Sequence, residues 1–171
     1  MPVTKPLDRD PALDVPMWRA LDLQRAYAYR DRGVAATILD DLDGAQLGDL
    51  VGVLIDMHNQ DLTDLSSLGA AVAVSALRSE FDQVAACAPA ESEFAITTVL
   101  RDVAGGADMT AALKSLAPVA RAHLLAAYVT AMNVSAFGRA GCQRRLEATA
   151  EITEQDLGKP RPYPQPLPAG R

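Results

Sequence analysis

A chain of 171 residues can bury one hydrophobic core, and its 49% apolar and 22% charged residues are ordinary for a globular domain. The formal net charge of −6 lies mostly in residues 1–85, where seven Lys or Arg stand against fourteen Asp or Glu. This acidic half disfavours general binding to phosphate backbones, and the longest apolar run, 68–77, is roughly half of what a bilayer span requires. We therefore expect no nucleic-acid partner and no membrane.

The cysteines and the N-terminus point to the cytoplasm. Cys87 and Cys142 form neither a CxxC pair nor a disulfide-dense framework, so we interpret them as small, half-buried apolar residues in a reducing compartment. Residues 1–16 lack the apolar stretch of a secretory signal. We expect a soluble, cytoplasmic protein.

The first expected elements are marked by prolines and by a helix cap. Prolines punctuate the start of the chain and predict an extended segment over residues 1–15. Pro16 suits the first turn of the first helix. Farther on, Asp43 and Gln46 have the spacing of a capping box, which predicts that a helix starts at Gly44.

The later elements are also separated by glycine and proline. Gly105 and Gly106 end one expected helix, and Pro118 opens another. No convincing strand pattern is present. The expected helices cover residues 16–31, 34–42, 44–59, 64–87, 91–104, 109–116, 118–133 and 139–152. We predict one all-α domain over 16–152, a compact bundle of about six to eight helices.

The chain resembles itself after a shift of 74 residues, which aligns segment 30–62 with segment 101–137. The matched pairs include Leu50 with Leu124, Asn59 with Asn133, Gly48 with Ala122, and Gly52 with Ala126. A true repeat predicts two pseudo-symmetric copies of three helices each, joined by the helix over 64–87. The alternative is two ordinary amphipathic helix pairs in an alanine-rich sequence.

Three glycines stand four residues apart in the helix that follows Asp43. Each internal glycine costs a helix roughly 1 kcal/mol relative to alanine, so a packing benefit is expected. Small residues at this spacing let another helix approach closely. We expect that another helix of the same chain packs closely on this face. One alternative is that the same surface of a second chain packs there, and another is that the glycines reflect amino-acid composition alone. The residues of this close-packing surface or interface are Gly44, Gly48, Gly52, Ala122 and Ala126.

No catalytic, cofactor or metal motif is evident. The two histidines, His58 and His123, belong to no metal-binding pattern. Carboxylates in the runs 40–43 and 56–64 are interpreted as helix caps and solvated charge. We expect no catalytic residue, no metal and no cofactor.

A small basic patch marks the last expected helix. It consists of Arg139, Arg144 and Arg145, and we interpret it as surface charge that pairs with Glu147 or Glu151 along the same helix. It is too small to predict a nucleic-acid interface.

The segment 153–171 has proline at every second position over much of its length. This density forbids helix and sheet and predicts a flexible, Pro-rich tail. Its PxxP spacing, with nearby cations and an aromatic ring, also resembles ligands of aromatic-lined grooves. The candidate docking residues are Pro160, Pro162, Tyr163, Pro164 and Pro166.

These observations favour a non-enzymatic, all-α protein that acts as an interaction, adaptor or regulatory protein. Its partner would be another protein, and this partner could be a second copy of the chain in a homodimer. The alternative is a small helical enzyme or ligand-binding protein with a pocket between the two copies. A polar cavity lined by His58, His123 or Tyr128 would favour that alternative.

Overall fold

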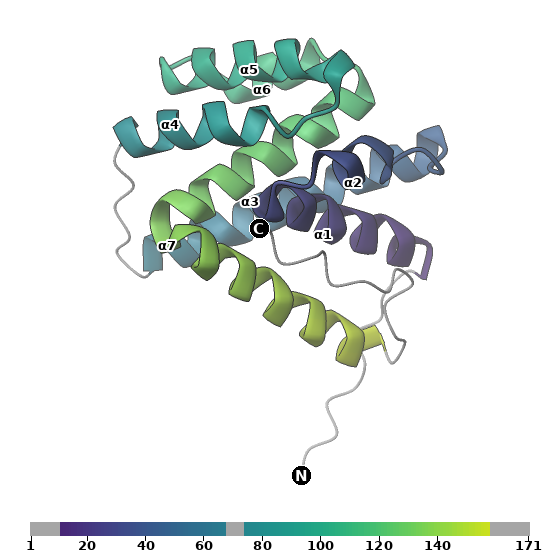
Figure 1. Ribbon diagram of the computed structural model, residues 1–171. Helices are drawn as coiled ribbons and strands as arrows, with labels where there is room; N and C mark the ends of the chain where they lie inside the picture. The colour runs from purple at the N-terminus through teal and green to yellow at the C-terminus, as the bar shows by residue number, and fades with distance from the viewer. Residues whose placement is uncertain (1–10, 68–73, 158–171) are drawn as a thin grey trace.

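Helices make up nearly all of the structure of the described residues (Figure 1). The computed structural model describes residues 11–67 and 74–157, and these contain seven α-helices, one 3-10 helix and no strand. The elements are η1 (Pro11–Leu13), α1 (Asp14–Tyr29), α2 (Arg32–Thr37), α3 (Gly44–Ser67), α4 (Val74–Ala85), α5 (Ala90–Ala104), α6 (Met109–Lys114) and α7 (Pro118–Leu157). The prediction of an all-α fold is confirmed. Among these helices, none is both long and apolar enough to span a lipid bilayer.

The first helix, α1, is buried along most of its length. Nearly every side chain from Pro16 to Ala28 is buried, the charged ones included. Its main neighbours are α7 and α3, and α2 lies beside it (Figure 1). A helix that is covered on all sides must find partners for its polar groups as well as for its apolar ones.

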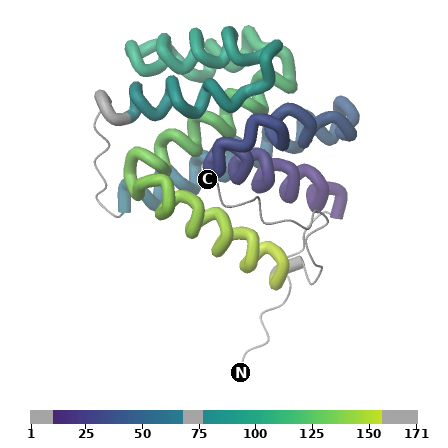
Figure 2. The backbone as a smooth tube through the Cα atoms, in the orientation of Figure 1, coloured from purple at the N-terminus to yellow at the C-terminus, as the bar shows by residue number. Residues whose placement is uncertain are grey.

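The last helix, α7, changes direction at Gly138. That residue has φ 71° and ψ 164°, which is outside the helical region and is adopted almost only by glycine. We call residues 118–137 the first arm and residues 139–157 the second arm, and the tube in Figure 2 shows the bend between them. The sequence analysis expected a separate helix that begins at Arg139, and the second arm begins at that residue.

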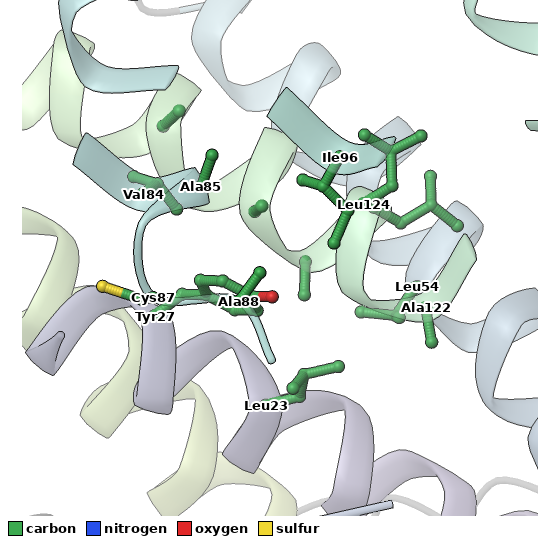
Figure 3. Close-up of a cluster of buried hydrophobic side chains, with 14 of the residues drawn as sticks. Leu23, Tyr27, Leu54, Val84, Ala85, Cys87, Ala88, Ile96, Ala122 and Leu124 are labelled. Atoms are coloured by element: carbon green, nitrogen blue, oxygen red, sulfur yellow. The ribbon is translucent and has the colours of Figure 1, made fainter. Parts of the chain in front are cut away.

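The main hydrophobic core joins α1, α3 and the first arm of α7 to the layer formed by α4 and α5. In Figure 3, Tyr27 of α1 lies beside Ala88, which lies between α4 and α5, and Leu23 of α1 belongs to the same cluster. Leu124 of the first arm faces Ile96 of α5 in the same cluster. A smaller cluster, around Trp18, Leu21, Val134, Cys142 and Leu146, packs α1 against both arms of α7.

Two helix caps occur as the sequence predicts. The carboxylate of Asp43 accepts hydrogen bonds from the backbone N–H of Ala45 and Gln46, and the Gln46 side chain accepts one from the N–H of Asp43. This is a complete capping box at the start of α3. Asp108 caps α6 by accepting a bond from the N–H of Thr110.

Several predicted boundaries are wrong. The break expected between 59 and 64 does not exist, because α3 continues to Ser67 through a stretch without glycine or proline. The joining helix over 64–87 is therefore reduced to α4. Helical structure also begins before residue 16 and runs to Leu157, beyond the expected limit of 152. The Pro-rich part of the tail lies outside the described residues.

The internal glycine crossing is also wrong. Gly44, Gly48 and Gly52 are exposed, and a methyl group built on any of them would meet nothing within 4 Å. By contrast, Ala122 and Ala126 are fully buried. Leucines direct α3 inward along the opposite face, namely Leu47, Leu50 and Leu54, and this stripe decides the orientation.

The aligned segments share some features and not others. Gly44 opens α3 and Pro118 opens α7, so the two helices start 118 − 44 = 74 residues apart, which is the shift found in the sequence. Yet the aligned small residues differ in environment, since Gly48 is exposed and Ala122 is buried. The small face therefore does not have the same role in both segments.

Gly48→Ala is expected to stabilise the protein by about 0.5–1 kcal/mol. The site is helical and exposed, so alanine gains helix propensity without a clash. Urea unfolding followed by circular dichroism measures the change. A loss of stability would mean that this face is covered in solution.

Gly138→Ala is expected to destabilise the protein by about 1–3 kcal/mol, because a Cβ atom is strained at this φ and ψ. Space does not decide the outcome, since the added methyl group would also meet nothing within 4 Å. The same unfolding measurement applies, with Gly48→Ala as the matched control. If the two substitutions changed the free energy of unfolding equally, the strained backbone conformation of Gly138 at the bend would be contradicted.

Candidate functional site

A cavity with polar side chains and an apolar wall lies where α1, α3 and both arms of α7 meet. Its volume is about 150 Å³ and it is partly open to solvent. The bend at Gly138 brings the two arms of α7 to the same cavity, because Asn133 precedes the bend and Arg145 follows it. The lining residues are Gln24, Met57, Gln60, Asp61, Asp64, Asn133, Cys142, Arg145, Leu146 and Thr149.

Asp61 is the most confined carboxylate of the cavity. Its side chain is only 20% exposed, and Asn133 Nδ2 donates to its Oδ2 at 2.7 Å. Burial raises the pKa of the Asp61 carboxyl, although the bond from Asn133 and the charge of Arg145 both act to lower it. The ionised form is therefore not fully compensated by its protein partners.

Arg145 is shared between two carboxylates and holds neither tightly. Its Nη2 lies 3.4 Å from Asp61 Oδ1 and 3.3 Å from Asp64 Oδ2, whereas charge-assisted bonds of this kind are usually about 2.7–2.9 Å. The guanidinium also stacks over the Phe137 ring, at 4.7 Å from its centroid. Two carboxylates and one guanidinium leave the lining with a formal excess of negative charge.

Two buried carboxamides add hydrogen-bonding groups to the cavity. Gln24 is 2% exposed and Asn133 is 5% exposed. The Asn133 amide donates to Asp61 and to the carbonyl oxygen of Val129, which fixes its NH₂ group and leaves its oxygen on the other side. The Gln24 amide donates to the thioether sulfur of Met57 at 3.3 Å, a weak acceptor. In the part of the chain that the structure describes, no group donates to either amide oxygen.

The thiol in the cavity is not a nucleophile at neutral pH. Cys142 is 1% exposed, and burial together with the charge of Asp61 raises its pKa to about 12. A thiol with this pKa stays protonated. It contributes an apolar wall instead.

A network of buried charges holds the cavity walls together. Arg25 of α1 is 1% exposed and donates to Asp22 at 2.8 Å and to Glu147 of the second arm at 2.9 Å. Both carboxylates are close enough to compensate a buried guanidinium. The expected pairing of Glu147 with arginines of its own helix is wrong, because Glu147 binds Arg25.

The basic patch of the last helix serves the same purpose. Arg139 donates to the carbonyl oxygens of Ala28 and Tyr29 at the end of α1, at 3.2 and 3.1 Å. Arg145 binds α3 as described. Arg139 and Arg145 therefore link the second arm to α1 and α3, while Arg139 and Arg144 remain exposed, as expected of a surface patch.

The two histidines lie in different surroundings and do not line the cavity. His58 lies beside the ring of Tyr128, at 5.5 Å between centroids. His123 is buried, and its Nδ1 is hydrogen-bonded to the hydroxyl of Tyr27 at 2.9 Å. Burial lowers the pKa of His123 to about 4. Among residues 11–67 and 74–157, no group of three or more His, Cys, Asp or Glu side chains could hold a metal ion.

The predicted site residues and the cavity do not coincide. The three glycines lie on the outer face of α3, Ala122 and Ala126 lie in the main core, and the five tail residues are outside the described residues. The sequence did contain a signal for Asp61, since it continues the inward stripe of Leu54 and Met57 at helical spacing. That Asp61 stands at a position expected to be buried says more about its role than that it belongs to an acidic run.

His123 is expected to make the protein acid-sensitive. The folded state holds this imidazole neutral, so the unfolded state binds more protons between its pKa of about 6.5 and the folded value of about 4. The contribution to stability is complete above pH 6.5 and is lost as the pH falls toward 4. At pH 5 the loss should be roughly 2 kcal/mol.

The measurement compares urea unfolding at pH 7 and pH 5 for the wild type and for His123→Gln. The variant should be less stable at pH 7 but should lose roughly 2 kcal/mol less between the two pH values. His58→Gln is the matched control and should follow the wild type. Parallel pH profiles for wild type and His123→Gln would show that the imidazole is not held neutral.

No protein-family model matches the chain, and comparisons with curated proteins and with solved structures find no similar protein.

Proposed function

We propose that this protein binds a small polar molecule in the cavity between α1, α3 and α7. The observation that carries the proposal is the pair of amide oxygens, of Gln24 and Asn133, whose side chains line the cavity beside Asp61 and which accept no hydrogen bond from the described residues. Polar atoms of this kind in an open cavity are usually satisfied by water or by a ligand. A cavity of this volume is large enough for a molecule about the size of benzene.

This proposal takes up the ligand-binding alternative of the sequence analysis with different residues. The pocket expected there contained His58, His123 or Tyr128, and none of them lines the cavity. The cavity walls are nevertheless built from distant parts of the chain, α1, α3 and α7. Held together by Arg25 and Arg145, they form a preorganised site.

The test is a ligand-observed NMR screen of small fragments against the wild type and Thr149→Trp. Thr149 lies exposed at the cavity, so the large ring should block entry and abolish binding of cavity ligands. Thr98→Trp is the matched control, because Thr98 is exposed on α5, lies away from the cavity, and makes the same bond to the carbonyl four residues earlier.

Fragments that bind the wild type and Thr98→Trp but not Thr149→Trp support the proposal. If no fragment distinguishes Thr149→Trp from the wild type, the cavity is not a binding site. Circular dichroism checks that both variants remain folded.

We propose a second function, protein–protein interaction, on a separate observation. One outward stripe of α3 joins the exposed glycines to two large apolar side chains, Ile55 and Leu62, which are 40% and 41% exposed. Glycines that weaken a helix and pack against nothing in the monomer are explained if another helix packs on them. Asp49 and Asp56, also exposed on α3, favour a partner helix that carries basic residues.

Gly48→Leu tests this second function. The side chain points to solvent, so we expect the free energy of unfolding to stay within about 1 kcal/mol of wild type while any association through this stripe is lost. Sedimentation velocity measures self-association, and affinity capture from the native cell measures a foreign partner. The control is Gly48→Ala, which adds little volume. Unchanged association in Gly48→Leu would exclude the stripe as an interface.

We also propose that the two aligned segments derive from one repeated unit. The order of a long, a short and a long helix in α1–α3 and again in α5–α7 supports this proposal.

The Pro-rich tail remains a candidate docking segment for another protein. Two free, buried cysteines are compatible with the proposed cytoplasmic location.

A further inference from the structure

The cavity offers a ligand hydrogen-bond acceptors on Gln24, Asp61, Asp64 and Asn133. Several of its NH groups are engaged, since the Asn133 amide binds Asp61 and Val129, the Gln60 amide binds Asp64 at 2.9 Å, and Nη2 of Arg145 contacts both carboxylates. The amide oxygens of Gln24 and Asn133 remain, together with free lone pairs on the carboxylates. A ligand that satisfies this lining must donate hydrogen bonds.

The net charge of the cavity also favours a ligand that carries hydrogen-bond donors, because that charge is negative. Asp61 and Asp64 face a single guanidinium, whose contacts of 3.4 and 3.3 Å are long for ion pairs. Asp61 is confined, with 20% of its side chain exposed, so its charge is screened less than that of a surface carboxylate. A cation placed between Asp61 and the two amide oxygens would remove this imbalance.

We propose that the cavity binds a small organic cation, a primary ammonium group carried on a short apolar body. The ammonium has three donors, which match Asp61, Gln24 Oε1 and Asn133 Oδ1. The thioether of Met57 and the side chain of Leu146 provide the apolar wall for the body of the ligand. This assignment of a ligand class rests on the proposed function of the cavity as a binding site.

The volume sets the size of the ligand. About 150 Å³ is the size of a cavity that accepts benzene, so a four-carbon chain with an amino group fits and a polyamine would extend into solvent. The probe is therefore n-butylammonium. Matched probes of similar shape are n-butanol, which is neutral, and butyrate, which is anionic.

The experiment is a titration of the full-length protein with each probe, followed by two-dimensional NMR. We expect n-butylammonium to shift the side-chain NH₂ signals of Gln24 and Asn133 and the methyl signal of Met57 in a saturable manner. The neutral and anionic probes should bind at least about tenfold more weakly. Asp61→Asn should weaken binding of n-butylammonium by about tenfold or more, because it removes the charge and keeps the shape.

Asp56→Asn is the matched control, since it makes the same charge change at an exposed site on the same helix and should leave affinity within about twofold. If Asp61→Asn does not fold, Asp64→Asn, at a carboxylate that is 39% exposed, replaces it and should weaken binding severalfold.

The outcomes separate the ligand class from the proposed function. If n-butanol or butyrate binds this cavity as well as n-butylammonium does, the inference of a cationic ligand is wrong while the cavity remains a binding site. If n-butylammonium binds equally to wild type and Asp61→Asn, the inference is also wrong. If no probe binds and no fragment distinguishes Thr149→Trp, both the ligand class and the proposed function fail.

Discussion

The backbone of Gly138 determines what α7 can contact. A continuous helix of 40 residues would be about 60 Å long and could not return to α1. Because Gly138 leaves the helical region, the first arm lies under α4 and α5 while the second arm lies along α1 (Figure 1) and contacts α3 through Arg145. The small core around Trp18, the ion pair of Arg25 with Glu147, and the cavity all depend on this change of direction.

Burial of α1 imposes a second constraint, because a helix enclosed on every side cannot leave its charges in water. Arg25 is compensated from within its own helix by Asp22 and from across the bundle by Glu147. Arg19 is likewise buried and pairs with Asp41. Such pairs add little net stability compared with apolar packing, but breaking one leaves a buried charge, typically at a cost of about 3–5 kcal/mol. They therefore determine the orientation of α1 against its neighbours more than they determine stability. The positions of the cavity walls are fixed by the same pairs.

Local features of the fold could be predicted from the sequence, and features that depend on contacts between distant residues could not. The capping box of Asp43 acts within a few residues, and the start of α3 was predicted correctly from it. The continuation of α3 past Asn59 was missed because polar residues without glycine or proline were given too much weight as helix ends. The glycine stripe was assigned to the wrong side because spacing alone does not tell an internal face from an external one. The cavity was missed for a different reason. Asn133 reaches Asp61 from the first arm of α7, and the bend at Gly138 brings Arg145 of the second arm to the same carboxylate; neither the spacing nor the types of these residues predicts that meeting.

The pairing of Arg25 with Glu147 also bears on how the chain reaches its native state. The two residues are 122 positions apart, although all-α proteins usually fold through contacts between near neighbours and do so rapidly. During synthesis, which proceeds from the N-terminus, α1 would emerge with apolar and charged groups on every face, and its cover on one side is made more than 100 residues later. The carbonyl oxygen of Ala28, at the end of α1, accepts hydrogen bonds from Arg139 and Gln143 of α7. The packing of α1 therefore cannot be completed until α7 has been synthesised.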